Sequence, residues 1–488
     1  MNETMENPVR QSLEREIKLE ANNGFILPEL PGRKLEPEVL VSTYYDTSDL
    51  RLATAGLTLR RRVKAGASGP VWQLKLPRGD ARAELECPAP NTTPPAELTH
   101  LLVAHTRGRA LHPAATLRTR RAGVRVRGIE GDLADVVVDD VDVLDGERVV
   151  KAFTEVEVEL IADAPSALEQ IERVLIAAGA VQGETRPKLL QALDVEPTRP
   201  PHAPRPGDPT SVHVRSRIAR QRDAIVARDP GTRLGTDPEE LHQMRVAVRR
   251  LRALLRATSS VQLGQWSEPL ADDLRWLGGM LGPVRDADVL LERFQQRSMS
   301  LSPGLQDPFS SALRPIVDAR TVARAELRDA LDSTRYLLLL DRLDQAALHA
   351  LLDDQGPTLE QLARKEFKRL KKRLCRLVEE SSDDELHAVR IAGKRARYAT
   401  ELASGTMKRD AAKFLRSTKR LQDVLGEHQD ACIAETELFR LAAATRSTDS
   451  AFAVGIVVER ERASQLEARG QLPAARRELE HAARGLWR

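Results

Sequence analysis

The sequence has few aromatic residues and few cysteines, and each shortage excludes a class of protein. Aromatic residues make up 3% of the 488 residues, which is too few to recognise single-stranded nucleic acid by stacking on its bases. The three cysteines, Cys87, Cys375 and Cys432, are far apart and odd in number. They predict neither a disulfide framework nor a zinc motif of regular spacing, and they favour a reducing cytoplasm.

Long apolar runs are also absent from the sequence. No run of about 20 apolar residues could form a membrane span, and the N-terminus, rich in Asn and Glu, lacks the apolar core of a secretion signal. We therefore expect a cytoplasmic protein without a membrane partner. Charged residues are abundant instead, with 75 basic and 72 acidic residues and a net charge of +3. Their local segregation is more informative than their sum, and the length predicts two or three domains.

The first segregated charges occur in the stretch 14–20. Glu14, Glu16, Lys18 and Glu20 alternate with Arg15, Ile17 and Leu19. In a β-strand this period of two puts three carboxylates and an amine on one face. A single strand of this kind can be an edge strand whose charges face water. The same pattern recurs, however, and that recurrence favours a shared polar cavity.

Alternating charged faces follow along the next 140 residues. They occur within 57–64, 71–76, 82–86, 117–127, 136–143 and 153–160, with turn signals between them. Short strands with little helix between them predict an antiparallel all-β unit. Charged fronts and apolar backs can both be satisfied if the sheet closes into a barrel with a polar lumen. Acidic strands lie at the start and end of the unit, so the lumen would hold separate carboxylate and cation clusters.

Such separate clusters suit phosphoryl chemistry. Carboxylates bind Mg²⁺ or Mn²⁺, whereas arginine and lysine bind the oxygens of a polyphosphate anion. A metal ion beside clustered cations positions a phosphoryl group and neutralises its charge. The sequence contains no Walker-type glycine-rich loop, so a P-loop enzyme is not expected.

The motifs of this half resemble a CYTH domain, the fold of the triphosphate tunnel metalloenzymes. The resemblance covers about residues 10 to 195 and is carried, in order, by Glu14-x-Glu16-x-Lys18, Tyr44-Tyr45-Asp46-Thr47, Leu59-Arg60-x-Arg62, Lys75, Arg82-x-Glu84-x-Glu86, Asp139 and Glu155-x-Glu157-x-Glu159. It implies an eight-stranded antiparallel β tunnel with flanking helices. It also implies a divalent metal, and hydrolysis or cyclisation of a triphosphate.

The resemblance also implies roles for individual residues. The implied metal ligands are Glu14, Glu16, Asp139, Glu155 and Glu157. The implied catalytic residues are Glu14, Glu16, Lys18, Arg60 and Arg62, and the implied substrate-binding residues are Lys75, Arg82, Arg118, Arg120 and Lys188. The pair Asp139-Asp140 leaves one ligand open, because alternation does not choose between the two aspartates. The residues do not identify the general base.

A proline-rich stretch separates this half from the rest of the chain. Its proline density blocks helix and sheet and favours an extended spacer, and His202 within it is expected to be solvated. We expect a tunnel domain at 1–198, a linker at 199–210 and a helical domain at 211–488. The whole would be an α+β multidomain protein.

The second half shows helical periodicity and an internal repeat. Ala, Leu, Arg and Glu predominate, and we expect helices near 211–228, 238–258, 267–299, 308–331, 335–353, 357–380, 383–404, 408–444 and 449–485. A His-containing stretch at 241–252 returns at 386–397, an offset of 387 − 242 = 145 residues. A period this long indicates a duplicated helical bundle, with repeats of about 211–355 and 356–488.

Each repeat carries a basic stripe on one helix face. His242, Arg245, Arg249 and Arg252 step by three or four residues, and His387, Arg390, Lys394 and Arg397 repeat the pattern. Like charges at this spacing repel one another, so a stripe kept in both copies is expected to meet an anion. A solvated helix face, a metal at the histidines and duplex DNA are the alternatives.

This half resembles a CHAD domain, a helical module that often follows CYTH domains. The resemblance rests on the two His-x-x-Arg stretches and on the paired Leu-Gly…Asp segments at 281–286 and 425–430. It implies that the two stripes bind inorganic polyphosphate, and it extends from about residue 211 to the C-terminus.

Together the two halves predict a metal-dependent inorganic triphosphatase with a polyphosphate-binding helical domain. The alternatives are an adenylate cyclase, and a polyphosphate-binding or granule-targeting protein without catalysis. Inorganic triphosphate and polyphosphate are the expected partners, and nucleic acid is not expected. The physiological substrate, the preferred metal and the oligomeric state stay open.

Overall fold

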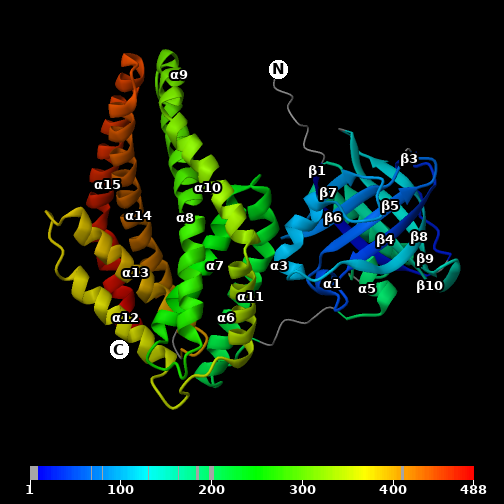
Figure 1. Ribbon diagram of the computed structural model, residues 1–488, viewed down its shortest axis with the longest axis horizontal. Coiled ribbons are helices and arrows are strands. Elements are labelled where there is room, and N and C mark those ends of the chain that lie inside the picture. The colour runs from blue at the N-terminus through cyan, green and yellow to red at the C-terminus, as the bar shows by residue number, and fades with distance from the viewer. Residues whose placement is uncertain are drawn as a thin grey trace. The chain divides into compact units, whose positions relative to one another are not determined.

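The computed structural model describes residues 9–487, apart from residues 23, 68, 80, 130, 163, 183–185, 197–202 and 408–410. Part of the predicted linker, with His202, lies outside the described residues. The chain forms two compact units, Met1–Pro200 and Pro201–Arg488, which are drawn from blue to teal and from green to red in Figure 1. Each unit is described by itself.

The first unit is built on one antiparallel sheet. Its strands are β1 (Arg10–Glu14), β2 (Glu16–Ala21), β3 (Gly32–Lys34), β4 (Glu38–Asp46), β5 (Thr58–Lys64), β6 (Val71–Arg78), β7 (Ala81–Pro88), β8 (His112–Arg127), β9 (Asp132–Asp145) and β10 (Arg148–Leu160). Its helices are α1 (Arg51–Thr54), α2 (Ala96–Thr99), α3 (Val103–Thr106), α4 (Pro165–Ala177) and α5 (Lys188–Leu193), with a 3-10 turn at His100–Leu102.

The sheet closes into a ring through its first strand. The strand order is β1-β7-β6-β5-β4-β8-β9-β10-β2, and only Arg15 separates β1 from β2. The two ends of the sheet are therefore halves of one segment, of which β1 pairs with β7 and β2 pairs with β10. The ring has eight strand positions, as expected, although ten strands are present, because β1 and β2 share one position and β3 only pairs with β8.

The ring has an apolar outside and a charged inside. On the outer face Leu19, Val136 and Val156 pack against Ile171 and Leu175 of α4. The alternate residues of the same strands point into the ring. One end of the interior is filled by α5, whose Leu189 and Leu190 pack with Tyr44, Leu117 and Val141. The expected polar lumen is therefore present, and α5 lies at its end.

A close approach between β8 and β9 requires glycine at one position. A side-chain Cβ at Gly123 would lie 2.2 Å from the carbonyl oxygen of Val136, which any larger residue would clash with. This contact helps the two long strands curve together beside the lumen.

The second unit is entirely helical. Its helices are α6 (Thr210–Leu234), α7 (Pro238–Ala257), α8 (Ser267–Ser298), α9 (Pro303–Ala312), α10 (Arg314–Asp332), α11 (Thr334–His349), α12 (Leu359–Leu374), α13 (Asp383–Ala403), α14 (Ala412–Ala444) and α15 (Thr448–Leu486). None of the helices in the described part of the chain is both long and apolar enough to span a bilayer. The repeat seen in the sequence places its basic stripes on α7 and α13.

Several of the expected helix boundaries were wrong. The helices expected to end at residues 353 and 380 end at His349 and Leu374. The first helix continues past residue 228 and through Pro230, because the buried Arg233 pairs with Asp229 at 2.7 Å and donates to the Leu331 carbonyl, which holds the last turn. The helix expected at 308–331 is two helices, α9 and α10, which meet at Leu313. The expected starts of α7 and α13 are confirmed by side-chain caps from Asp237 and Ser382.

Candidate functional site

Three carboxylates from neighbouring strands meet inside the ring. Asp139 of β9 lies opposite Glu155 of β10, and Glu157 follows on the same face. Their oxygen atoms lie within 4.8 Å of one another, and Asp139 is fully buried. Oxygen-only donors of this kind suit a hard divalent cation such as Mg²⁺ or Mn²⁺. The alternation of β9 also settles which aspartate faces the lumen, because Asp140 accepts a hydrogen bond from Thr154 on the opposite face.

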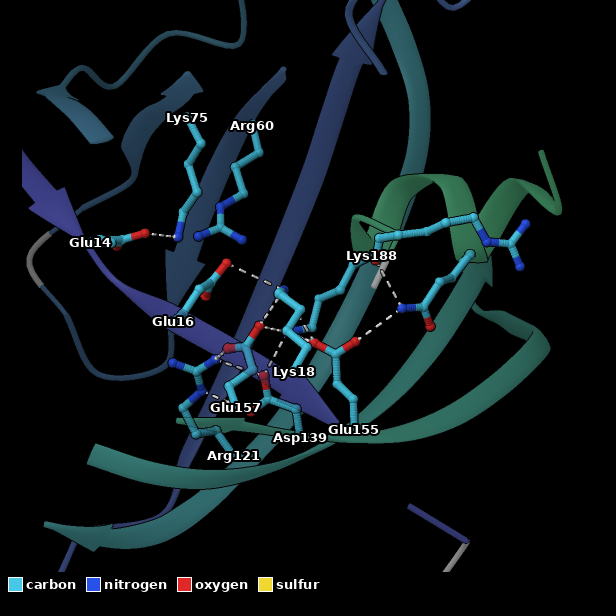
Figure 2. A network of polar contacts seen from close by, with 12 residues as sticks. Glu14, Glu16, Lys18, Arg60, Lys75, Arg121, Asp139, Glu155, Glu157 and Lys188 are labelled. Carbon is cyan, nitrogen blue, oxygen red and sulfur yellow. Dashed lines mark hydrogen bonds and ion pairs between the residues drawn. The ribbon is translucent and has the colours of Figure 1, made fainter. Parts of the chain in front are cut away.

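Lysine and arginine side chains hold these carboxylates in the structure (Figure 2). Lys188 Nζ lies 2.7 Å from Asp139, 2.6 Å from Glu155 and 2.9 Å from Glu157. Lys18 Nζ lies 2.6 Å from Glu157. Burial alone would raise the pKa of Asp139, but Lys188 and the guanidinium of Arg121 lower this pKa below its usual value. Asp139 is therefore ionised, and a divalent ion would have to replace some of the cations around the three carboxylates.

Glu16 extends the acidic cluster along β2. Its carboxylate lies 3.3 Å from Arg82 and 3.8 Å from Lys18. Glu16 Oε1 is buried and has no hydrogen-bond partner among the described residues. A buried carboxylate oxygen without a hydrogen bond is costly, so this oxygen is a reasonable further donor to a cation.

Glu14 has a different environment from the other predicted metal ligands. It pairs closely with Lys75, and Glu84 lies beside the same lysine at 3.8 Å. Burial and the neighbouring Glu14 raise the pKa of Glu84 to about 8. The structure therefore places Glu14 with the cations of β6 and β5 and outside the three-carboxylate group.

Two further arginines of the lumen, Arg60 and Arg62, lie on β5. Arg60 is buried, donates to Gln73 at 2.8 Å and to the Tyr44 hydroxyl at 3.2 Å, and lies 3.8 Å from Glu84. Arg62 lies beside it on β5, and its Nε has no hydrogen-bond partner among the described residues. Burial and the neighbouring Arg60 lower the pKa of Arg62 to about 10. An arginine that is disfavoured as a cation by its surroundings would be stabilised by a bound phosphate.

Arg118 and Arg120 do not join the lumen. Both pair with Asp142 on the outer face, and their side chains are 39% and 53% exposed. Arg121 takes the inward position, with Nε 2.8 Å and Nη2 2.6 Å from the two oxygens of Asp139. The sequence reading missed Arg121, although counting by two from the buried Leu117 reaches it.

The second unit brings cations from both repeats together. Arg245 and Arg249 of α7 lie near Arg390 and Lys394 of α13, and burial together with Arg390 and Arg249 lowers the pKa of Lys394 to about 8. Arg249 donates to the hydroxyl of Tyr398 at 2.8 Å. We call Arg245, Arg249, Arg390 and Lys394 the basic cluster. Tyr398 was not predicted, although it lies one turn after Lys394 on the same face.

The other stripe residues have separate surroundings. His387 lies 2.6 Å from the Gln429 side chain, and Arg397 pairs with Glu401 at 2.8 Å. Arg252 lies among Arg256 and Arg275, which lower its pKa together with burial. His242 stays near the basic cluster, and burial and Arg285 lower its pKa. The structure therefore brings together four of the eight predicted residues, with His242 at their side.

Comparisons with known proteins agree with this two-part architecture. The CYTH domain family matches residues 12–184 and the CHAD domain family matches residues 216–438. An uncharacterized protein of Mycobacterium tuberculosis strain H37Rv is 30% identical over 511 aligned residues, which cover 97% of each chain.

Three solved structures are each similar to part of this chain. The CHAD domain from the plant Ricinus communis is 29% identical and covers 57% of this chain and 94% of its own, with a TM-score of 0.48. PptA from Streptomyces chartreusis is 22% identical and covers 57% of this chain and 100% of its own, with a TM-score of 0.45. The PH1819 protein from Pyrococcus horikoshii is 20% identical and covers 37% and 98%, with a TM-score of 0.26.

Proposed function

Because the chain belongs to the proteins in which a CYTH domain is followed by a CHAD domain, we propose that it is a metal-dependent inorganic triphosphatase that also binds inorganic polyphosphate. One observation carries the first part of the proposal. The lumen holds three carboxylates within 4.8 Å of one another, of which Asp139 and Glu155 are buried, together with Arg62, a guanidinium that lacks a hydrogen-bond partner at Nε among the described residues. A triphosphate anion and a divalent cation would each complete one of these two clusters.

The lumen residues have two roles in the proposed reaction, which are metal binding and phosphate binding. Asp139, Glu155 and Glu157 would hold Mg²⁺ or Mn²⁺, with Glu16 as a further donor. The bound ion neutralises phosphate charge and acts as a Lewis acid. Arg60, Arg62 and Lys75 bind phosphate oxygens and stabilise the charge that develops on the transferred group. Lys18 and Lys188, once a divalent ion has replaced them at the carboxylates, are available to the same phosphate chain.

Phosphate release from tripolyphosphate tests this proposal. The purified chain should release phosphate when Mg²⁺ or Mn²⁺ is added and should stop when the ion is chelated. Glu16→Ala should lower the rate at unchanged fold, as checked by circular dichroism. A rate that Glu16→Ala leaves unchanged would defeat the proposal. ATP serves as a second substrate, because cyclic AMP as the main product would favour the cyclase alternative.

The polyphosphate part of the proposal rests on the basic cluster. Cations that lie beside one another repel, and a polyanion relieves this repulsion while releasing its own counterions. Binding should therefore weaken steeply as salt rises. Long-chain polyphosphate should also displace duplex DNA from the chain at equal phosphate concentration. Stronger binding of DNA would instead favour a nucleic-acid partner.

A further inference from the structure

Three side chains that commonly bind metals meet in the second helical repeat. Asp383 is the first residue of α13, and His428 and Cys432 lie one turn apart on α14. Cys432 Sγ lies 3.7 Å from Asp383 Oδ2 and 4.0 Å from His428 Nε2, which in turn lies 3.4 Å from Asp383 Oδ1. None of the three belongs to the lumen site or to the basic cluster.

These separations are close to those within a zinc ligand shell. Zinc binds nitrogen and oxygen at about 2.0 Å and sulfur at about 2.3 Å in a tetrahedron, so its ligand atoms lie roughly 3.3–3.6 Å apart. One ligand atom from each of the three side chains already lies within 4.8 Å of the other two, so small side-chain movements would bring these atoms to that geometry. Two helices already supply the three protein ligands, and the fourth position can be taken by water.

Arg469 of α15 shows that this position accepts a cation. Its Nε donates to His428 Nε2 at 3.1 Å, and its Nη2 pairs closely with Asp383. A histidine that accepts a hydrogen bond at Nε2 carries its own hydrogen on Nδ1, which is the tautomer that an Nε2-bound metal requires. The Arg469 side chain is 29% exposed and that of Asp383 is 60% exposed. A metal ion can therefore approach from solvent while the guanidinium moves outward.

We propose that Asp383, His428 and Cys432 bind a Zn²⁺ ion, which displaces Arg469 and links the start of α13 to α14. The thiol loses its proton to solvent when the zinc–sulfur bond forms. Thiolate and imidazole favour zinc over the hard cations Mg²⁺ and Mn²⁺, so the two units select different metals. The separation of the three cysteines along the sequence gave no sign of this site, because its ligands come from two helices.

Cobalt binding provides a direct test, since Co²⁺ bonded to a thiolate absorbs in the near ultraviolet. The metal-free full chain is titrated with Co²⁺ in the presence of excess Mg²⁺, which saturates the lumen carboxylates. One equivalent of thiolate absorption is expected, and added Zn²⁺ should remove it. Cys432→Ser should abolish the band, and Asp383→Asn should weaken Co²⁺ binding at least tenfold. The matched control is Cys375→Ser at an exposed cysteine, which should retain the band.

Arg469→Ala separates a metal site from a purely structural contact. Removing the competing guanidinium should tighten Co²⁺ binding severalfold if the ion takes its place. A folded wild-type chain without the band, a band that persists in Cys432→Ser, or weaker binding in Arg469→Ala would overturn the proposal. Circular dichroism of each variant establishes that it is folded.

Discussion

Two lysines, one in each unit, have opposite electrostatic surroundings. In the lumen, Lys188 lies within 2.9 Å of three carboxylates, and although burial opposes it, these partners raise its pKa well above the usual value. In the basic cluster, Lys394 lies near Arg390 and Arg249, and its pKa falls to about 8. Lys188 is paired with carboxylates of its own unit, whereas Lys394 has too little negative charge nearby to offset its neighbouring arginines.

This difference determines what each site can accept. At the three carboxylates, Lys18, Lys188 and Arg121 balance the negative charge, so the proposed triphosphate would bind there together with a divalent cation that replaces Lys18 or Lys188. The basic cluster keeps an excess of positive charge, although Asp286 lies 2.7 Å from Arg245 and Asp430 lies 3.9 Å from Arg390, so an anion alone would improve its energy. The proposed triphosphatase site would therefore depend on a metal, whereas the proposed polyphosphate site would not.

The largest expected effect concerns the paired aspartates of β9. Asp139→Asn removes an inward carboxylate from the metal cluster, and we expect it to lower tripolyphosphate hydrolysis on the order of 10³-fold, or about 4 kcal/mol. Asp140→Asn, on the outer face, should keep most of the activity. Steady-state phosphate release measures both variants. Equal losses would mean that the lumen carboxylates do not hold the metal.

Matched lysine substitutions test the internal balance itself. Lys188→Met leaves the buried Asp139 and Glu155, and the half-buried Glu157, with less positive charge, so the metal-free tunnel unit should lose about 3 kcal/mol of stability. Lys394→Met removes a repelled cation and should leave the stability of the helical unit unchanged or raise it. Urea unfolding of both variants gives the comparison. A larger loss of stability for Lys394→Met than for Lys188→Met would contradict the proposed difference between the two lysines.

Polyphosphate binding tests the excess of positive charge in the basic cluster. Alanine at Arg245, Arg249, Arg390 and Lys394 together should weaken binding roughly 100-fold at low salt and flatten its salt dependence. Alanine at the exposed Lys365, Lys368 and Lys372 removes nearly as much charge from α12 and should cost much less. Binding measured by fluorescence anisotropy compares the two sets. Similar losses would indicate general charge attraction.

The smallest expected effect is a dependence of binding on pH. Lys394 without ligand has a pKa of about 8, and a bound polyanion raises it again. Binding therefore takes up a proton above about pH 8, so affinity falls as pH rises, by roughly tenfold at most per pH unit. Calorimetry in buffers with different ionisation enthalpies measures the proton uptake. Lys394→Arg should remove it, since arginine stays charged.

The sequence predicted the lumen best where apolar residues mark the alternation. Val156 separates Glu155 from Glu157, and Val158 follows Glu157, so the inward direction of the two glutamates could be read directly. Residues 118–121 read Arg-Thr-Arg-Arg and follow the apolar Leu117. An apolar back was expected to face outward, so the pattern pointed to Arg118 and Arg120. Leu117 instead packs with α5 at the end of the interior, and the register with β9 turns Arg121 inward.

In the helical unit, residue spacing predicted which side chains share a helix face. It did not predict which side chains of different helices contact one another. The stripes on α7 and α13 were visible as steps of three and four residues. Which members converge depends on how the two helices pack, so the separate partners of His387 and Arg397 could not be read from the chain. Contacts between different helices, such as Arg249 with Tyr398, leave no periodic signal.

The closure at Arg15 has a consequence for how the first unit assembles. Because β2 is held by β10, the opening strand finds its partner only after about the next 130 residues have been made, as the Lys18–Glu157 pair illustrates with a separation of 139 positions. Joining such distant segments is entropically expensive and slow. The emerging chain therefore exposes two unpaired sheet borders until β10 arrives. Closure then pairs both of these borders, and among the described strands β3, which pairs only with β8, keeps an unpaired side.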